Sequence, residues 1–151
     1  FSGSDITQVS FSGADLTGAI LTGVRGEYTN FSSARADGLD FRKSSFLMSD
    51  FSGARLEGAD FSDTALGQSL FIKAFCNAAC FRRADLSYAN FSHAKIHGAD
   101  FTDAILTYTD MHAVIIEEAK WGGADTSTIF RTDMELLEAE VWEANKANAK
   151  K

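Results

Sequence analysis

The side chains of this 151-residue chain that could do chemistry are three histidines, two cysteines and a set of regularly spaced aspartates. His93 and His112, with Asp110 beside them, offer the imidazole and carboxylate ligands that zinc uses in proteins. We interpret them instead as solvated surface histidines, because the set is small. The five-residue repeat described below also places His93 and His112 on the outside of the fold. Cys76 and Cys80 are too few for a disulfide framework. We expect Cys76 to be a core residue and Cys80 to be exposed.

The aspartates offer a second chemistry, because paired carboxylates can act as general acid and base. Asp40, Asp60 and Asp100 are spaced by multiples of 20 residues. Aspartate also bonds to the backbone of turns, and we prefer that interpretation. The sequence contains no phosphate-binding loop, no nucleophile elbow and no metal-binding cysteine pair. We therefore predict no enzymatic activity, no cofactor and no metal.

The sequence has an internal repeat of five residues, and this repeat determines which of these side chains can lie close together. When the chain is counted modulo five from Phe1, 11 of its 13 phenylalanines share one column. From residue 1 to 121 this column has 25 members, and only Gly26 and Ala36 lack a sizeable apolar side chain. The column two residues earlier consists of Ala, Ser, Thr or Val, with Leu39 as the one exception.

A period of five fits neither the 3.6 of a helix nor the 2 of a strand. Two inward positions in every five residues require a chain that turns a corner once per repeat. Gly, Ser, Asp and Asn fill many of the outward positions, as turns need. The sequence thus predicts a tube with large side chains at its centre and small ones near its corners.

Three blocks carry a resemblance to a known family, with its A(D/N)Lxx motif: Ala14-Asp15-Leu16-Thr17-Gly18, Ala84-Asp85-Leu86-Ser87-Tyr88 and Ala89-Asn90-Phe91-Ser92-His93. Residues 1–125 resemble the pentapeptide-repeat family. The resemblance implies an all-β solenoid, a right-handed, four-sided β-helix with four pentapeptides per coil. Twenty-five pentapeptides would make about six coils, which at ~4.8 Å per coil is a tube of ~30 Å.

Columns spaced by 20 residues are consistent with four sides. Phenylalanine dominates two opposed columns and aliphatic residues dominate the other two. Like side chains would then stack on like. Gly26 leaves a hole in its column, and we expect the ring of Phe46 in the next coil to cover it.

The repeat fails after Asp125, where a polar link over 126–131 precedes an expected helix over 132–149. Thr132 to Glu135 has the pattern of a capping box. Met134, Leu137 and Val141 form one apolar face, with Trp142 beside it. We favour a lid over the last coil. The alternative is that this helix pairs two chains.

The outward positions that break the repeat are the candidate partner surface. All three tyrosines, Tyr28, Tyr88 and Tyr108, share one outward column with Met48, and Leu47 lies nearby. Tyrosine and methionine are typical of interface cores. A second candidate is an apolar belt in the fourth coil, which includes Leu70 and Phe75. Alternatively, Phe75 lies flat over neighbouring coils.

Composition excludes several classes of protein. The net charge of −7 argues against a direct nucleic-acid or anionic-membrane binder. No apolar run is long enough to span a membrane. The repeat is already in register at Phe1, so we expect a fragment, a processed protein or an ordered core. Localisation is left open between cytoplasm, thylakoid lumen and secretion.

These observations predict a protein-binding scaffold without catalysis, its partner being another protein. The resemblance implies an alternative, because some family members bind DNA gyrase as acidic, dimeric mimics of DNA. A tube of ~30 Å would then need roughly 18 negative charges, since duplex DNA carries one per ~1.7 Å. Residues 1–125 contain 16 acidic and 10 basic residues, a net charge of −6.

Overall fold

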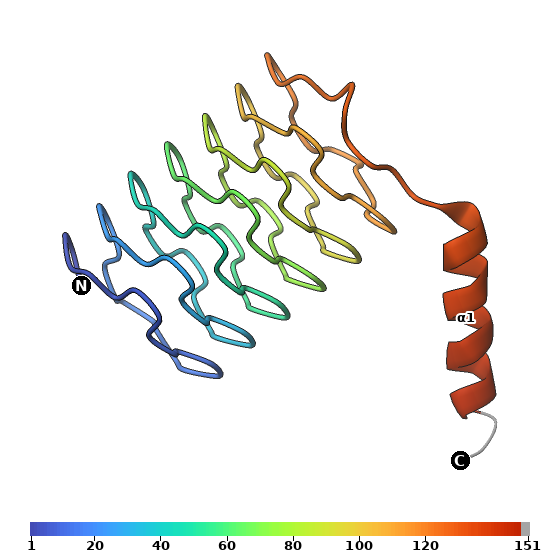
Figure 1. The fold of residues 1–151 in the computed structure, drawn as a ribbon, viewed down its shortest axis with the longest axis horizontal. Helices are drawn as coiled ribbons and strands as arrows, with labels where there is room; N and C mark the ends of the chain where they lie inside the picture. The colour runs from blue at the N-terminus through green and yellow to red at the C-terminus, as the bar shows by residue number, and fades with distance from the viewer. Residues whose placement is uncertain (149–151) are drawn as a thin grey trace.

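The computed structural model describes residues 1–148 and consists of stacked coils followed by one helix, α1 (Met134–Asn148). Each coil takes 20 residues, because single parallel bridges join residues 20 apart, such as Asp5 to Arg25. The bridges form four ladders, one for each side of the tube. Figure 1 shows the coils rising in sequence order from the N-terminus toward the link and α1.

A tight turn closes every pentapeptide and makes the corners. The backbone N–H of Ser4 donates to the carbonyl of Phe1, and the same bond recurs along the chain, for example from Ala54 to Phe51. The third residue of each pentapeptide has a positive φ, from Gly3 to Gly123. The residues before and after each turn bond to the neighbouring coils, as Ile6 N–H does to the carbonyl of Arg25. The pentapeptide is therefore one bridge plus one corner.

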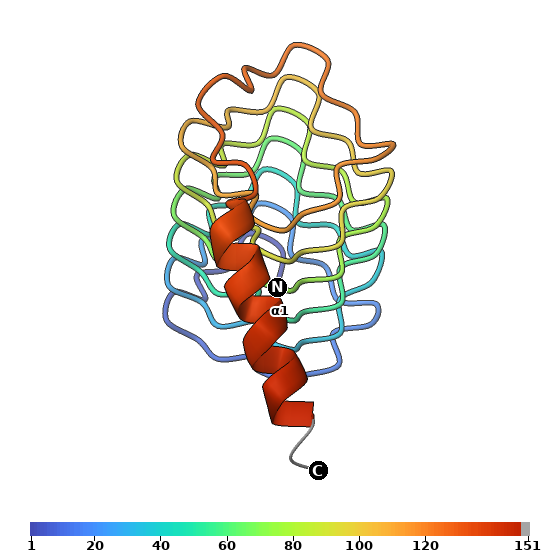
Figure 2. The ribbon, with the colours of Figure 1, turned by 90° about the vertical axis from the view of Figure 1, so that its right-hand side faces the viewer.

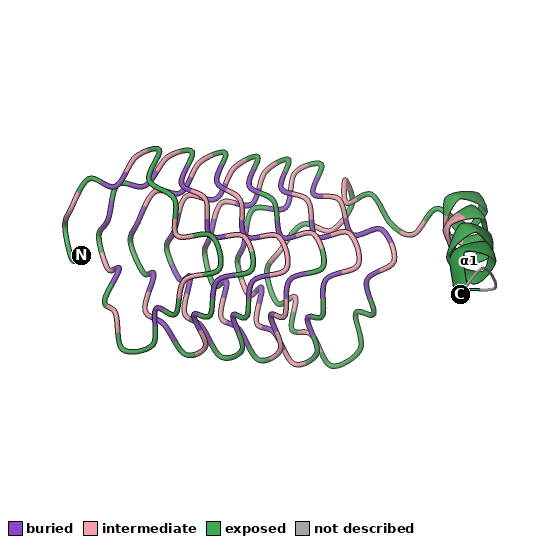
Figure 3. Cartoon of the chain, turned by 90° about the horizontal axis from the view of Figure 1, so that it is seen from below, coloured by how far each residue is buried: buried purple, intermediate pink, exposed green. Residues whose placement is uncertain are grey.

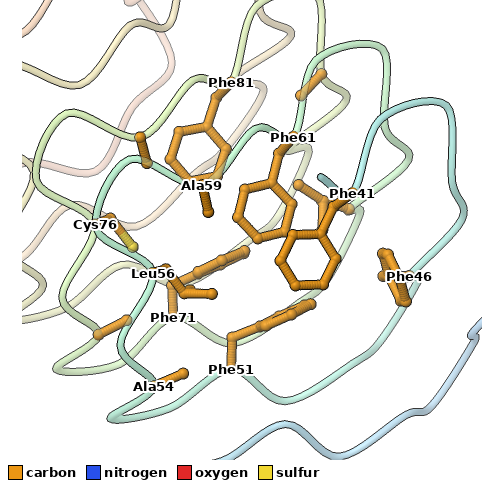
Figure 4. Close-up of a cluster of buried hydrophobic side chains, with 14 of the residues drawn as sticks. Phe41, Phe46, Phe51, Ala54, Leu56, Ala59, Phe61, Phe71, Cys76 and Phe81 are labelled. Carbon is orange, nitrogen blue, oxygen red and sulfur yellow. The ribbon is translucent and has the colours of Figure 1, made fainter. Parts of the chain in front are cut away.

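Aromatic rings stacked along the tube form the core (Figure 4). Phe41 lies parallel to Phe61 at 4.5 Å between ring centroids, and Phe51 lies parallel to Phe71 at 4.9 Å. The two stacks meet edge to face, with the rings of Phe51 and Phe61 at 5.5 Å and 88°. Both arrangements suit the charge distribution of an aromatic ring. The stacking of like on like that the sequence predicts is thus present.

The small residues near the corners are buried, and their hydroxyls are satisfied. Thr64 Oγ1 donates to the carbonyl of Phe41 at 2.9 Å, and Ser69 Oγ donates to that of Phe46 at 2.7 Å. Each bond reaches 23 residues back, into the preceding coil. A hydroxyl at this position therefore adds a link between coils instead of an unpaired polar group.

Burial falls off at both ends of the tube (Figure 3). Phe1 is 54% exposed although it belongs to the core column. At the other end Ile116 is 45% exposed. A hollow of about 430 Å³ opens there, lined by Met111, Val114, Ile116, Trp121, Thr126, Ile129, Arg131 and Thr132.

The coil pattern continues into the segment expected to be a link. Phe130 forms a parallel bridge with Asp110, 20 residues earlier, and its N–H donates to the carbonyl of Thr109. Ile129 packs partly buried against the core. The coil therefore continues past Asp125, where sequence analysis expects the repeat to fail, because the 20-residue step outlasts the loss of the five-residue motif.

The helix begins two residues later than expected. Asp133 Oδ1 accepts the N–H of Leu136 at 3.1 Å, so Asp133 and not Thr132 caps the N-terminus. Both residue types make good caps, and the carboxylate one residue closer to the helix forms the bond. Residue 149, the last of the expected helix, lies outside the described residues.

The lid expected over the last coil is not formed by α1 in the single chain. The link carries α1 away from the end of the tube (Figures 1 and 3), and in Figure 2 it crosses in front of the coils. None of its residues is buried. Met134, Val141 and Trp142 are each more than half exposed. Within residues 1–148, nothing covers the apolar face of α1 or the hollow at the end of the tube.

Candidate functional site

The corner that holds the three tyrosines differs from the other corners. Each side of the tube has its own column of third turn positions, and the tyrosine column consists of Gln8, Tyr28, Met48, Gln68, Tyr88 and Tyr108. All six have φ between 53° and 62°. The other three columns contain glycine at this position, nine in all, and the tyrosine column contains none.

A positive φ crowds the Cβ of any residue with a side chain, which is why glycine is favoured there. The left-handed conformation costs an ordinary residue about 1–2 kcal/mol. For bulky side chains such as Tyr28, Met48, Tyr88 and Tyr108 it is uncommon. This corner therefore keeps large side chains where the backbone favours glycine.

The tyrosine column forms an exposed aromatic row toward the C-terminus. Tyr88 is 59% exposed, and its ring centroid lies 5.4 Å from that of Tyr108. Tyr108 in turn stacks on Phe130 at 5.9 Å and 25°. Sequence analysis missed Phe130, although the 20-residue step from Asp110 could have found it.

Of the two leucines near this row, Leu70 is the more exposed. Leu70 stands in the same bridge ladder as Phe130 and is 39% exposed. Leu47 is partly buried, and Gly67 in the next coil leaves room for it, since a Cβ there would lie 3.4 Å from Leu47 Cδ2. The row thus gains apolar area from neighbouring positions on the same side.

Phe75 lies apart from this row, in the ladder between Arg55 and Lys95. Its ring is partly buried, and the Lys95 ammonium lies 4.9 Å from the ring centroid. Such a cation over the ring face is favourable. One face of the Phe75 ring is therefore already occupied within the chain.

His112 is buried, so the interpretation of His93 and His112 as solvated surface histidines is wrong. Both rings meet a residue that sequence analysis did not connect with them. His93 Nε2 and His112 Nε2 lie 3.1 and 3.4 Å from Glu140 Oε2, which comes from α1. Asp110 does not join them, because its carboxylate accepts the N–H of His112 and the hydroxyl of Ser92. The rings of His93 and His112 are 5.4 Å apart and nearly perpendicular.

His93 and His112 change the pKa of the Glu140 carboxylate. Partial burial opposes its ionisation, but hydrogen bonds from His112 and His93 outweigh that effect and lower its pKa. The approach of α1 could not be deduced from the repeat, because Glu140 lies outside it.

The regularly spaced aspartates serve the turns. Asp40, Asp60 and Asp100 each accept the N–H of the residue two positions later through Oδ1. Arg42 also donates to Asp40 at 2.7 and 2.9 Å, and these hydrogen bonds lower the pKa of Asp40 to about 2. A depressed pKa and a turn partner suit structural support, not proton transfer.

The two cysteines differ as expected. Cys76 is buried, and burial raises the pKa of its thiol, which makes it a poor nucleophile. Cys80 is partly exposed, and its sulfur lies 3.1 Å from Ser62 Oγ.

The second candidate site is the apolar side of α1. Leu137, Val141 and Trp142 line a shallow hollow of about 380 Å³ along the helix. Lys146 lies over the Trp142 ring at 4.6 Å. Among the described residues, no helix is both long and apolar enough to cross a lipid bilayer.

Comparison with known proteins identifies the repeat. A family model for pentapeptide repeats matches in eight copies, over residues 1–23, 10–46, 27–63, 49–87 and 84–120. A comparison with curated protein sequences found no match.

Several solved structures resemble the chain. HetL, a pentapeptide repeat protein involved in heterocyst differentiation regulation in the cyanobacterium Nostoc, is 23% identical, with a TM-score of 0.42 over 88% of this chain and 68% of that one. Rfr23 from the cyanobacterium Cyanothece is 20% identical, with a TM-score of 0.41 over 80% and 90%. QnrB1, a plasmid-mediated fluoroquinolone resistance protein, is 20% identical, with a TM-score of 0.36 over 85% and 70%.

Proposed function

The chain belongs to the pentapeptide-repeat family, and on that premise we propose that it is a non-enzymatic scaffold that binds another protein. The scaffold is a right-handed β-helix of about six coils, each about 4.8 Å deep. Its binding surface is the tyrosine column with Phe130, Leu47 and Leu70, and Phe75 adds a smaller apolar area. The observation that carries the proposal is the row of exposed aromatic side chains at positions of positive φ.

Strain retained at exposed positions supports a role in binding. Tyr28, Tyr88 and Tyr108 gain little burial from their places, yet each adopts a backbone conformation that glycine adopts at lower cost. Strained residues cluster at sites of function. Rigid aromatic side chains also lose little entropy on binding, which is why they dominate interface energetics.

The row has the form of a protein-binding surface. Tyr108 contacts both Tyr88 and Phe130, and all three side chains are more than 40% exposed. Contiguous exposed apolar area of this kind marks interaction sites more often than scattered single residues do. The coils behind it are held by a ladder of backbone bonds, so a partner would meet a rigid surface.

The proposal is tested by binding to partners captured from the source cell's lysate. Wild-type chain and the triple variant Tyr28→Ala, Tyr88→Ala, Tyr108→Ala are immobilised side by side. Lys73→Ala is the matched control, because Lys73 occupies the same turn position with φ of 58° on another side. A protein retained by wild type and Lys73→Ala but lost from the triple variant supports the proposal. Equal capture by all three chains contradicts it.

The second candidate is the dimeric DNA mimic that binds gyrase. One observation favours it: the apolar face of α1 is uncovered, as a helix that pairs two chains would be before assembly. The charges argue against it. Arg25, Arg35, Arg42, Arg55 and Arg83 each form an ion pair with an acidic side chain and thereby interrupt the acidic surface.

A gyrase supercoiling assay separates the two candidates. Inhibition or protection from a quinolone by a dimer at micromolar concentration would favour the mimic. No effect from a stable dimer would leave the scaffold.

A further inference from the structure

The contact between α1 and the coils is made by groups that bind metals. Within residues 1–148, the polar side-chain contacts of α1 with the coils are those of Glu140 with His93 and His112. Both imidazoles direct Nε2 toward the same carboxylate oxygen. The three donor atoms lie within 4.8 Å of one another.

We propose that His93, His112 and Glu140 form a zinc site that fastens α1 to the side of the β-helix. The site is independent of the tyrosine column and does not rest on the proposed scaffold function. Two histidines and one glutamate are a ligand set that zinc uses when a fourth position is held by water. Among divalent metals, an imidazole-rich set with one carboxylate suits zinc better than calcium or magnesium.

The separations fit tetrahedral coordination. Zinc bonds of about 2.0–2.1 Å place neighbouring ligand atoms roughly 3.3 Å apart. The nitrogen–oxygen separations here are 3.1 and 3.4 Å. The His93 side chain is 31% exposed, so it has room to rotate and bring its nitrogen to the same separation from His112.

The solvent access of the site and the charge of its ligands also suit a zinc ion. The side chains of His93 and Glu140 are partly exposed while that of His112 is nearly buried, so an ion can enter from one side and meet a fixed ligand. Glu140 supplies one negative charge, whereas the two neutral imidazoles supply none. A glutamate carboxylate is ionised at neutral pH, so Glu140 need not lose a proton to bind the metal.

Metal binding would replace the contacts of the two imidazoles with Glu140, and it would also change a hydrogen bond on the far side of the His112 ring. His112 Nδ1 accepts the N–H of Asp133 at 3.2 Å, which leaves the ring proton of a neutral His112 on Nε2. Coordination through Nε2 requires that proton to move to Nδ1, so the bond from Asp133 is given up. The last residues before α1 therefore shift when the metal binds, and the metal couples the link to the coils.

The test is titration of the untagged full chain with zinc, measured by calorimetry, and with cobalt(II), measured by visible absorption. We expect one metal per chain and the intense absorption of tetrahedral cobalt. His93→Gln and Glu140→Gln should each weaken zinc binding by more than about tenfold, the lower end of what even an outer-shell partner contributes.

Two control variants distinguish this site from surface binding. His97→Gln removes the third histidine, whose partner in the structure is Glu118. Glu138→Gln removes a carboxylate from the exposed side of the same helix. Both should bind zinc as wild type does. The proposal is overturned if wild type binds no more zinc than Glu140→Gln, if either control weakens binding as much, or if the cobalt complex is octahedral.

A second measurement reports on the fastening of α1. Zinc should slow amide hydrogen exchange in Met134–Asn148 of wild type and have no such effect in Glu140→Gln. Equal protection in both chains would mean that the metal binds elsewhere.

Discussion

The ring of Phe46 occupies the space that Gly26 leaves open in the coil below. A Cβ placed on Gly26 would lie 2.6 Å from Cε1 of Phe46, closer than atoms of this kind approach. Phe46 uses this space to meet Phe31, Phe41 and Phe51 edge to face. One missing side chain in an aliphatic column thus accommodates one aromatic ring.

Gly26→Ala should therefore destabilise the fold by about 1–3 kcal/mol, as overpacking of a core does. Chemical denaturation measures this change. Gly67→Ala is the matched control, because its Cβ would meet Leu47 at an ordinary 3.4 Å, and it should cost much less. Phe46→Leu should recover part of the loss in Gly26→Ala. Equal costs for both glycines would contradict this account.

Phe51→Ala should cost about 3–5 kcal/mol, as for other buried aromatic residues. Phe51 is fully buried and lies between Phe31 and Phe71 in its stack. Phe1 belongs to the same core column of the five-residue repeat but lies at the exposed end of the tube. Phe1→Ala should therefore cost far less. Urea denaturation of the two variants provides the comparison, and similar costs would show that the stack is not what stabilises the tube.

Tyr88→Ala should change the free energy of unfolding by less than about 1.5 kcal/mol, the upper range for one aromatic pair. It loses contact with Tyr108 but little burial. Binding of a partner should nevertheless weaken. If Tyr88→Ala unfolds the chain, the tyrosine column is structural and the proposed binding surface is wrong.

Stability should fall as the pH drops from about 4 to about 2, in part because of Asp40. Hydrogen bonds from Arg42 lower the pKa of Asp40 from 3.8 to about 2, so its stabilising effect is complete above 3.8 and is lost as pH falls through 2. Asp40→Asn keeps the oxygen that accepts the turn N–H but cannot ionise. Its denaturation midpoint should fall less over this range than that of wild type. Parallel losses would exclude Asp40 as a contributor.

The second candidate requires a dimer, and Trp142→Glu should dissociate it. Trp142 is 61% exposed and lines the apolar hollow on α1 with Leu137 and Val141, so a charge there would be buried on pairing. Sedimentation equilibrium measures the mass of both chains. Glu143→Gln, on the same helix, should remain dimeric. A wild-type chain that is monomeric at high concentration would remove the dimer from consideration.

The repeat could be predicted from the sequence because each pentapeptide has the same physical task. A large apolar residue, a small residue and a turn recur without insertion, so the core, the stacking of Phe41 on Phe61 and the pairing of Gly26 with Phe46 could all be expected. The positive φ of the third residue is less visible, since Tyr88 and Gly98 occupy equivalent backbone conformations with opposite preferences.

Features outside the five-residue motif were harder to predict from the sequence. Phe130 keeps the 20-residue step but not the five-residue motif, and the motif was what sequence analysis followed. The cap moved from Thr132 to Asp133 because two good caps are adjacent. Glu140 approaches His93 and His112 through a helix whose direction depends on the link, and no periodicity encodes that direction.

Parallel bridges every 20 residues constrain how the gene can gain or lose sequence. Insertion or deletion of 20 residues adds or removes one coil and leaves every side chain on its side. A deletion of five residues preserves the core but rotates all later residues by one side. Such a deletion between Met48 and Tyr88 would divide the tyrosines between two sides of the tube. A change in length by whole coils therefore leaves each residue on its side of the tube. A change by a single pentapeptide produces a new combination of side chains on every side.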